Sequence, residues 1–115
     1  MFFDYVKEKE GYETIQAEGG FLSYVINGQE FYIGHFYVAP SHRKSPAHFV
    51  ALMREAFARA RAADASVFSC HVALASKNAN ALLISYLKFG FEVRGQDHFG
   101  LVLTLPLERC EWLSR

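Results

Sequence analysis

The character of the sequence changes once, near Pro40, and no other feature constrains the fold as strongly. Before this residue, short aromatic and β-branched runs alternate with glycine-containing breaks, which is the pattern of strands joined by turns. After it, apolar residues recur at three- and four-residue intervals over residues 46–63, which is the period of an amphipathic helix. The strand-like runs cover residues 2–7, 12–17, 21–26 and 30–38.

The predicted elements alternate in the second half of the chain. An apolar run at residues 67–73 suits a buried strand, and the helix before it predicts a parallel crossover from the strand at 30–38. The predicted order is β-β-β-β-α-β-α-β-β, an α/β (α+β) fold with a mixed, mostly antiparallel sheet of six to seven strands and two main helices. The remaining elements are a helix at 78–89 and strands at 91–94 and 99–105.

Local signals predict where these elements end. The pair Asn27-Gly28 allows positive φ at both central residues of a tight turn, which predicts a hairpin. Pro46 fits the first turn of the first helix, and Ser45 is then the expected N-cap. The second helix is predicted to be capped by Asn78 or Asn80. It is predicted to end at Gly90, in the left-handed conformation.

The composition bounds the class of protein. With 115 residues, of which 51% are hydrophobic, the chain is predicted to form one domain over residues 1–115. Twelve basic residues balance twelve acidic ones, so no global field draws the protein to nucleic acid or to an anionic membrane. The start has no secretory-signal pattern and no long apolar run occurs, so a cytoplasmic location is expected.

The cysteines and histidines predict neither metal binding nor thiol catalysis. Cys70 and Cys110 are far apart in the sequence and are expected to be reduced. Cys70 and His71 are adjacent on a predicted strand and so point to opposite faces, which argues against a thiolate pair. The spacing of the histidines matches no metal site.

The segment from Tyr37 to His48 runs from a strand into the start of a helix. Such a junction offers free backbone N–H groups and the positive end of the helix dipole to an anion. Arg43 and Lys44 add positive charge beside it. The segment therefore predicts a site for a pyrophosphate, and a solvated structural turn is the alternative.

Two motifs, in this order, resemble the GNAT acetyltransferase superfamily. Val38, Pro40 and Arg43 match the Val-x-Pro and following arginine at the end of the family's fourth strand. Residues 86–91, Tyr-Leu-Lys-Phe-Gly-Phe, are similar to the family's Tyr-x-Lys-x-Gly-Phe. The resemblance spans residues 20–105, and short members of this kind resemble those that phages and prophages encode.

The resemblance implies transfer of an acetyl group from acetyl-CoA to an amine of a small molecule or protein, without a metal. It implies that the Val38 N–H group stabilises the oxyanion and that Tyr86 protonates the departing thiolate. For the base, the sequence leaves His35, Glu30, His71 and a relayed water open. The implied cofactor-binding residues are Tyr37, Val38, Arg43, Lys44, Ser45, Ala47, His48, Asn80 and Tyr86.

The chain also departs from the family. Pro46 and His48 stand where the family's turn has glycine, which removes one backbone donor and adds a ring where phosphate approaches. The family's helices between its first two strands have no counterpart, so the acceptor site is expected to be open or closed by another subunit. The apolar end with Trp112 and Leu113 suggests a homodimer. The alternative function is a catalytically inactive GNAT-like binding or structural protein.

Overall fold

The computed structural model describes residues 11–77 and 79–114. The predicted strand at 2–7 lies outside these residues, and the other predicted elements occur in the predicted order. The strands are β1 (Glu13–Ala17), β2 (Gly20–Asn27), β3 (Glu30–Val38), β4 (Val67–Val72), β5 (Glu92–Asp97) and β6 (Gly100–Pro106). The helices are α2 (Ala47–Ala62) and α3 (Ala79–Phe89), with 3-10 helices η1 (Pro40–His42) and η2 (Leu107–Ser114).

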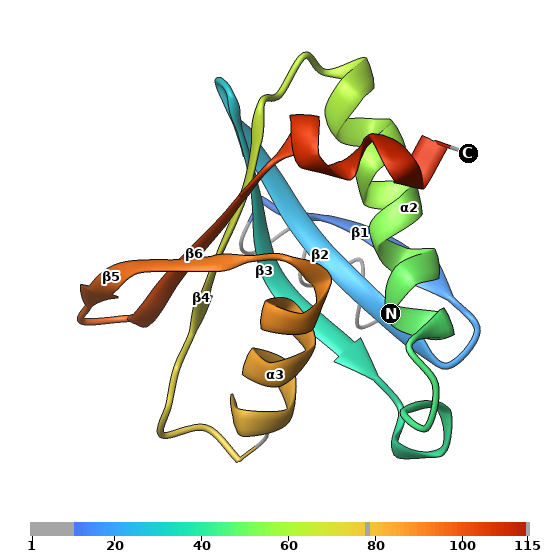
Figure 1. Cartoon of the computed structure of the whole chain (residues 1–115), viewed down its shortest axis with the longest axis vertical. Helices are drawn as coiled ribbons and strands as arrows, with labels where there is room; N and C mark the ends of the chain where they lie inside the picture. The colour runs from blue at the N-terminus through green and yellow to red at the C-terminus, as the bar shows by residue number, and fades with distance from the viewer. Residues whose placement is uncertain (1–10, 78, 115) are drawn as a thin grey trace.

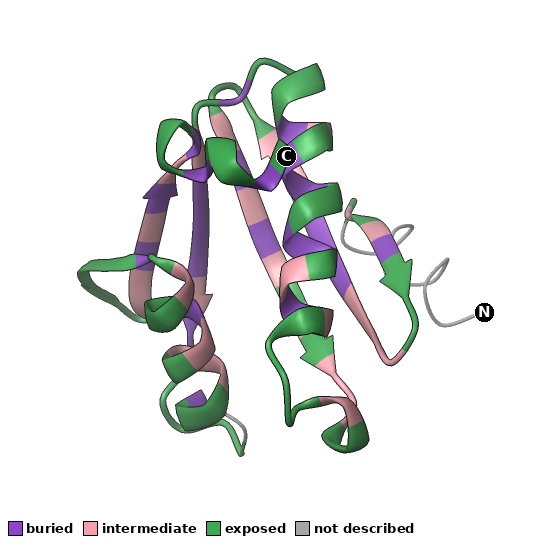
Figure 2. Cartoon of the chain, turned by 45° about the vertical axis from the view of Figure 1, so that its right-hand side comes forward, coloured by how far each residue is buried: buried purple, intermediate pink, exposed green. Residues whose placement is uncertain are grey.

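The six strands form one sheet in the order β1-β2-β3-β4-β6-β5 (Figure 1). β3 and β4 are parallel, and the other neighbouring pairs are antiparallel. The predicted mixed, mostly antiparallel α+β fold is therefore confirmed. Both helices lie on the same face of the sheet (Figure 2), since Phe36 of β3 contacts Phe49 of α2 and Tyr86 of α3.

One hydrophobic core fills the space between the sheet and the helices. At its centre, the ring of Phe31 stacks on Tyr24 with centroids 4.4 Å apart and meets the edge of Phe68 at 5.2 Å. Of the apolar positions that predicted the first helix, α2 leaves Val50 partly exposed and buries the others, which are Phe49, Leu52, Met53, Ala56, Phe57 and Ala60. Within residues 11–77 and 79–114, no helix is long and apolar enough to cross a membrane.

The turn between β2 and β3 lies one residue later than predicted. Asn27 pairs with Glu30, so the central turn residues are Gly28 and Gln29 rather than Asn27 and Gly28. Gly28 has a φ of 59°, and a type II′ turn requires positive φ at its first central position only. The hairpin is thus confirmed, although its register differs from the prediction.

A β-bulge in β3 decides which side chains face the helices. Opposite β2, the strand carries one extra residue, Gly34, because Ser23 pairs with His35 whereas Tyr24 pairs with Ile33. Glycine is needed there because a Cβ atom would lie 2.0 Å from a neighbouring tyrosine ring. The extra residue shifts the side-chain alternation by one. Residues 31, 33 and 36 therefore face the helices, and residues 32, 35 and 37 face away from them.

The start of α2 differs from the prediction by one residue. Its N-cap is Pro46, whose carbonyl accepts the Val50 N–H group at 2.9 Å, so Ser45 precedes the cap position. The Ser45 hydroxyl nevertheless accepts the N–H group of Ala47 at 3.2 Å. Ser45 therefore provides an acceptor for the first N–H group of the helix, although it lies outside the helix.

The ends of α3 match the prediction in part. Asn80 is the second residue of the helix and so is not its cap, and Asn78 lies outside the described residues. Gly90 follows the helix with a φ of 126°, and its N–H group bonds to the Tyr86 carbonyl at 3.1 Å. Glycine thus ends α3 with a positive φ, as predicted.

The C-terminal segment folds back onto α2 as η2, which the sequence did not predict. Leu107, Cys110 and Leu113 are buried, and Arg54 of α2 donates to the Leu113 carbonyl at 2.5 Å. The Leu113 side chain therefore belongs to the chain's own core, and the homodimer stays a prediction. Trp112 is 42% exposed and lies against Phe89, with ring centroids 5.4 Å apart.

Gly20 provides a test of the close approach between β2 and the end of β3. A Cβ atom at Gly20 would lie 2.4 Å from the Tyr37 carbonyl oxygen. Gly20→Ala is expected to lower the free energy of unfolding by about 1–3 kcal/mol, because backbone atoms must shift. Gly95→Ala is the matched control, since nothing lies within 4 Å of a Cβ atom there. Equal denaturation midpoints for the two variants would contradict this contact.

Candidate functional site

A pocket of about 610 Å³ opens between the end of β3, the loop that leads into α2, and α3. In Figure 1 the loop and α3 lie at the same end of the sheet. Aromatic and aliphatic side chains from four elements form much of its wall, and they are Phe36, Val38, Phe49, Val50, Leu82, Ile84, Phe89 and Trp112. The pocket therefore combines a large apolar surface with the predicted anion-binding turn.

The turn presents backbone donors to this pocket. Within the described residues, no acceptor bonds to the N–H groups of Lys44, Ser45 or Phe49, and all three residues line the pocket. These groups surround the N-terminus of α2, where the helix dipole adds a partial positive charge. The arrangement can therefore bind an anion through backbone amides.

The charged side chains of the pocket lining are all cationic. Arg43 and Lys44 come from the turn, and Lys88 comes from the last turn of α3. No aspartate or glutamate of the described chain belongs to the lining. Arg43 is held in place, since its Nε atom donates to the Val38 carbonyl at 2.6 Å and its guanidinium lies over the Tyr37 ring.

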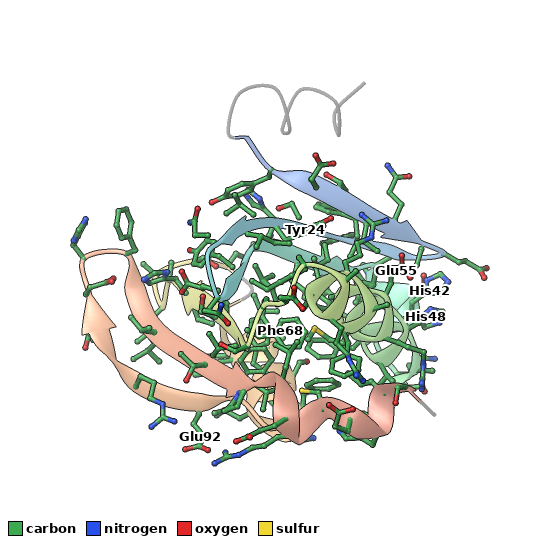
Figure 3. All side chains as sticks on the ribbon, turned by 90° about the horizontal axis from the view of Figure 1, so that it is seen from above. Tyr24, His42, His48, Glu55, Phe68 and Glu92 are labelled. Carbon is green, nitrogen blue, oxygen red and sulfur yellow. The ribbon has the colours of Figure 1, made fainter. Side chains whose placement is uncertain are left out.

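Two histidine rings contact each other in the turn. The rings of His42 and His48 meet edge to face, with centroids 4.5 Å apart (Figure 3). The Ser41 hydroxyl is hydrogen-bonded to His42 Nδ1 at 2.9 Å. A Cβ atom at Gly19 would lie 2.5 Å from the His42 ring, so the glycine before β2 makes room for this ring. The turn is therefore braced by side chains rather than built from glycine.

The structure brings only part of the predicted cofactor set together. Tyr37, Val38, Arg43, Lys44 and Ser45 line the pocket, whereas Ala47, His48, Asn80 and Tyr86 do not. His42, Lys88 and Trp112 line the pocket without having been predicted. Lys88 lies within the second motif, at residues 86–91, so its place in this motif was the sequence signal for a residue of the pocket. No sequence pattern indicated Trp112, because only the fold of η2 carries it to the pocket.

β3 and β4 part beside this pocket. They pair only between Glu30–Ile33 and residues 67–70, and β3 then runs on to Val38 without pairing with β4. The Ala39 N–H group bonds to the Gly19 carbonyl, so by the alternation of an antiparallel ladder the N–H group of Val38 points away from β2. This amide is therefore directed into the gap, where an oxyanion would need a donor.

Tyr86 lies in the gap on the helix side. It is 1% exposed, and its ring packs against Phe36, Phe49 and Phe91. Its side chain lies beside the Cys70 thiol, and burial raises the pKa of Tyr86 well above its ordinary value. The hydroxyl is therefore protonated at neutral pH. The rings of Phe36 and Phe49 separate it from the pocket.

The three candidate bases lie on the opposite face of the sheet. Glu30 accepts a hydrogen bond from Ser69, and His35 is hydrogen-bonded to Ser23 at 2.8 Å. His71 has the more extended contacts, to the Tyr32 hydroxyl at 2.8 Å and the Asp97 carboxylate at 2.9 Å, and neither partner was predicted. In the described residues no group of three or more His, Cys, Asp or Glu side chains could hold a metal.

Comparison with known proteins identifies the fold. No model of a known protein family matches the sequence, and no curated protein matches it. The PaiA N-acetyltransferase of Thermoplasma acidophilum, solved with coenzyme A, matches with a TM-score of 0.69 at 16% identity over 88% of this chain and 65% of that one. Nourseothricin acetyltransferase matches with a TM-score of 0.64 at 25% identity over 77% of this chain and 58% of that one.

A third match is a protein of similar length. The anti-CRISPR protein AcrVA5 matches with a TM-score of 0.65 at 19% identity over 82% of this chain and 97% of that one. This chain spans less than two thirds of the length of the two acetyltransferases. The fold is that of the GNAT acetyltransferases.

Thiol reactivity tests the burial of Cys70 behind Tyr86. Burial raises the pKa of Cys70 from 9.0 to about 12, so the thiol is not ionised at neutral pH. In a Cys110→Ala variant at pH 8, Cys70 is expected to react with Ellman's reagent only after denaturation. The free energy of unfolding is expected to fall as the pH rises from 9 toward 12, because deprotonation favours the unfolded state. Rapid labelling of the native protein would contradict this burial.

Proposed function

We propose that this protein is an acyl-CoA-dependent N-acyltransferase that transfers an acetyl group from acetyl-CoA to an amine of a small molecule or protein. One observation carries the proposal: a cationic pocket with open backbone amides lies beside the parted strands of a GNAT fold. The coenzyme A bound to the PaiA N-acetyltransferase supports the choice of ligand.

The turn is proposed to hold the pyrophosphate. The N–H groups of Lys44 and Ser45 and the start of α2 supply donors, and Arg43 and Lys88 supply positive charge. The apolar wall that includes Phe89 suits the less polar parts of the ligand. Binding of the charged and apolar parts in one pocket positions the thioester for attack.

The chemistry is proposed to occur where β3 and β4 part. The Val38 N–H group is the proposed oxyanion donor, and Tyr86 is the proposed acid for the departing thiolate. Because Phe36 and Phe49 cover the Tyr86 hydroxyl, the proposal requires the Phe36 ring to turn aside when the thioester binds. A rotamer change of one half-buried ring is a small movement compared with the opening of a lid.

Acetyl-CoA binding tests the pocket. At one hundred times its dissociation constant, a ligand of the folded state adds about 2.7 kcal/mol of stability, so acetyl-CoA is expected to raise the melting temperature. An Arg43→Gln, Lys44→Gln double variant is expected to bind at least about tenfold more weakly, because two phosphate partners are lost. Arg61→Gln, in the last turn of α2, is the charge control. No melting shift of the unmodified protein at millimolar acetyl-CoA would contradict the proposal.

A second candidate is a GNAT-shaped binding protein without catalysis. The observation that favours it is the enclosure of Tyr86, since the pocket stops at Phe36 and Phe49. Pro46 and His48 add to it, because they make the turn less permissive than a glycine turn. This candidate predicts a stable fold and no acetyl transfer.

Turnover separates the two candidates. With acetyl-CoA and a panel of primary amines, an acyltransferase releases the CoA thiol, and Tyr86→Phe is expected to lower kcat by about 10²–10⁴-fold at unchanged acetyl-CoA affinity. Tyr24→Phe, which removes a hydroxyl from another buried ring of the core, is the matched control. If the unmodified protein binds acetyl-CoA without releasing thiol, the binding protein is the correct reading.

A further inference from the structure

A chain of three hydrogen-bonded side chains crosses the face of the sheet that is turned away from α2 and α3. Tyr32 on β3 lies 2.8 Å from His71 Nδ1 on β4, and His71 Nε2 lies 2.9 Å from Asp97 Oδ2 on β5. The second carboxylate oxygen of Asp97 accepts the Phe99 N–H group at 2.8 Å. The turn between β5 and β6 therefore fixes the carboxylate that orients the imidazole.

The contacts define where the protons lie. The hydrogen bond from His71 holds the pKa of Asp97 below its ordinary value, so the carboxylate is ionised at neutral pH and accepts the proton of Nε2. In neutral His71 the other nitrogen, Nδ1, is then the acceptor, and the Tyr32 hydroxyl donates to it. Burial raises the pKa of Tyr32 to about 12, so its hydroxyl keeps its proton until His71 takes it.

The three hydrogen-bonded side chains lie where β3 and β4 part. His71 is the first residue of β4 beyond the last pair with β3, Ile33 with Cys70. Adjacent strand residues point to opposite faces. Cys70 therefore lies beside Tyr86 on the helix side, and His71 is hydrogen-bonded to Tyr32 on the other side. The proposed acid and this chain therefore flank the same gap from opposite faces of the sheet.

We propose that Tyr32, His71 and Asp97 are the base side of the acyl transfer, an inference that rests on the proposed function. Tyr32 Oη takes one proton from the ammonium of the acceptor while its own proton moves to His71 Nδ1. The products are a neutral amine, a neutral tyrosine and an imidazolium beside the Asp97 carboxylate, which stabilises the new positive charge.

The remaining proton and bond changes balance. The neutral amine attacks the thioester carbon, a C–N bond forms and the C–S bond breaks. Tyr86 donates its proton to the CoA sulfur, and the second amine proton restores the proton of Tyr86. One proton is left on His71 for each acetyl group transferred. The His71 side chain is 23% exposed, so this proton can pass to water. Tyr32 and His71 are thus catalytic residues, and Asp97 is a positioning residue.

The test compares two nucleophiles that differ in charge. A primary amine is protonated at neutral pH and needs a base, whereas hydroxylamine is uncharged and does not. His71→Gln and the conservative Asp97→Asn are expected to lower kcat for propylamine or spermidine, by about 10²-fold or more for His71→Gln. With hydroxylamine, both variants are expected to keep turnover within about threefold of the unmodified protein, since acetyl-CoA binding and the acid side are intact. His98→Gln, in the β5–β6 turn, is the histidine control.

The outcomes separate the two proposals. Equal losses of kcat with both nucleophiles would show that Tyr32, His71 and Asp97 only support the fold. Unchanged turnover of primary amines by His71→Gln would show that another group is the base. Either result overturns this inference and leaves the proposed function standing. If the unmodified protein binds acetyl-CoA and acetylates neither nucleophile, the proposed function and this inference fall together. Acetyl-CoA affinity, measured by calorimetry for each variant, is expected to equal that of the unmodified protein.

Discussion

The parting of β3 from β4 is the constraint on which the rest of the structure depends. In a central strand of a sheet, each backbone N–H and C=O group requires a partner. Beyond Ile33, β3 has no neighbour on its β4 side, so these groups find other partners or face a ligand. Arg43, in the turn that follows β3, donates to the Val38 carbonyl. This hydrogen bond holds the Arg43 guanidinium beside the start of α2. The same missing ladder leaves the Val38 amide directed into the gap and the turn free to form one wall of a pocket.

Aromatic rings fill the helix side of this gap, and they both stabilise and obstruct it. Phe36 stacks on Phe49 with centroids 4.4 Å apart, and both rings pack against Tyr86. The apolar area they bury stabilises the fold where the two strands make no hydrogen bonds to each other. Because these rings exclude water, they raise the pKa of Tyr86 and keep its hydroxyl from the pocket. Stability and access to this hydroxyl therefore oppose each other at the same residues.

The one-residue errors in the predicted element boundaries share a physical cause. The β2–β3 turn and the cap of α2 each differ from the prediction by one residue, because several nearby residues satisfy the same local rule. The fold of η2 was missed for another reason: burial against α2, rather than a local preference, makes Leu113 part of the core. For the same reason no sequence pattern indicated that Trp112 lines the pocket.

The sequence by itself determined the order of the elements, the mixed sheet and the position of the turn proposed to bind an anion, because hydrophobic period and turn residues act over a few neighbouring positions. Only the tertiary structure decided which side chains share a face and which strands meet. The bulge at Gly34 puts Tyr32 and His35 on one face. Strand order and register then bring Tyr32 to His71 across 39 positions and His71 to Asp97 across 26. Contacts of this kind depend on how whole strands pair, and strand pairing is fixed by packing of the complete core rather than by any local pattern.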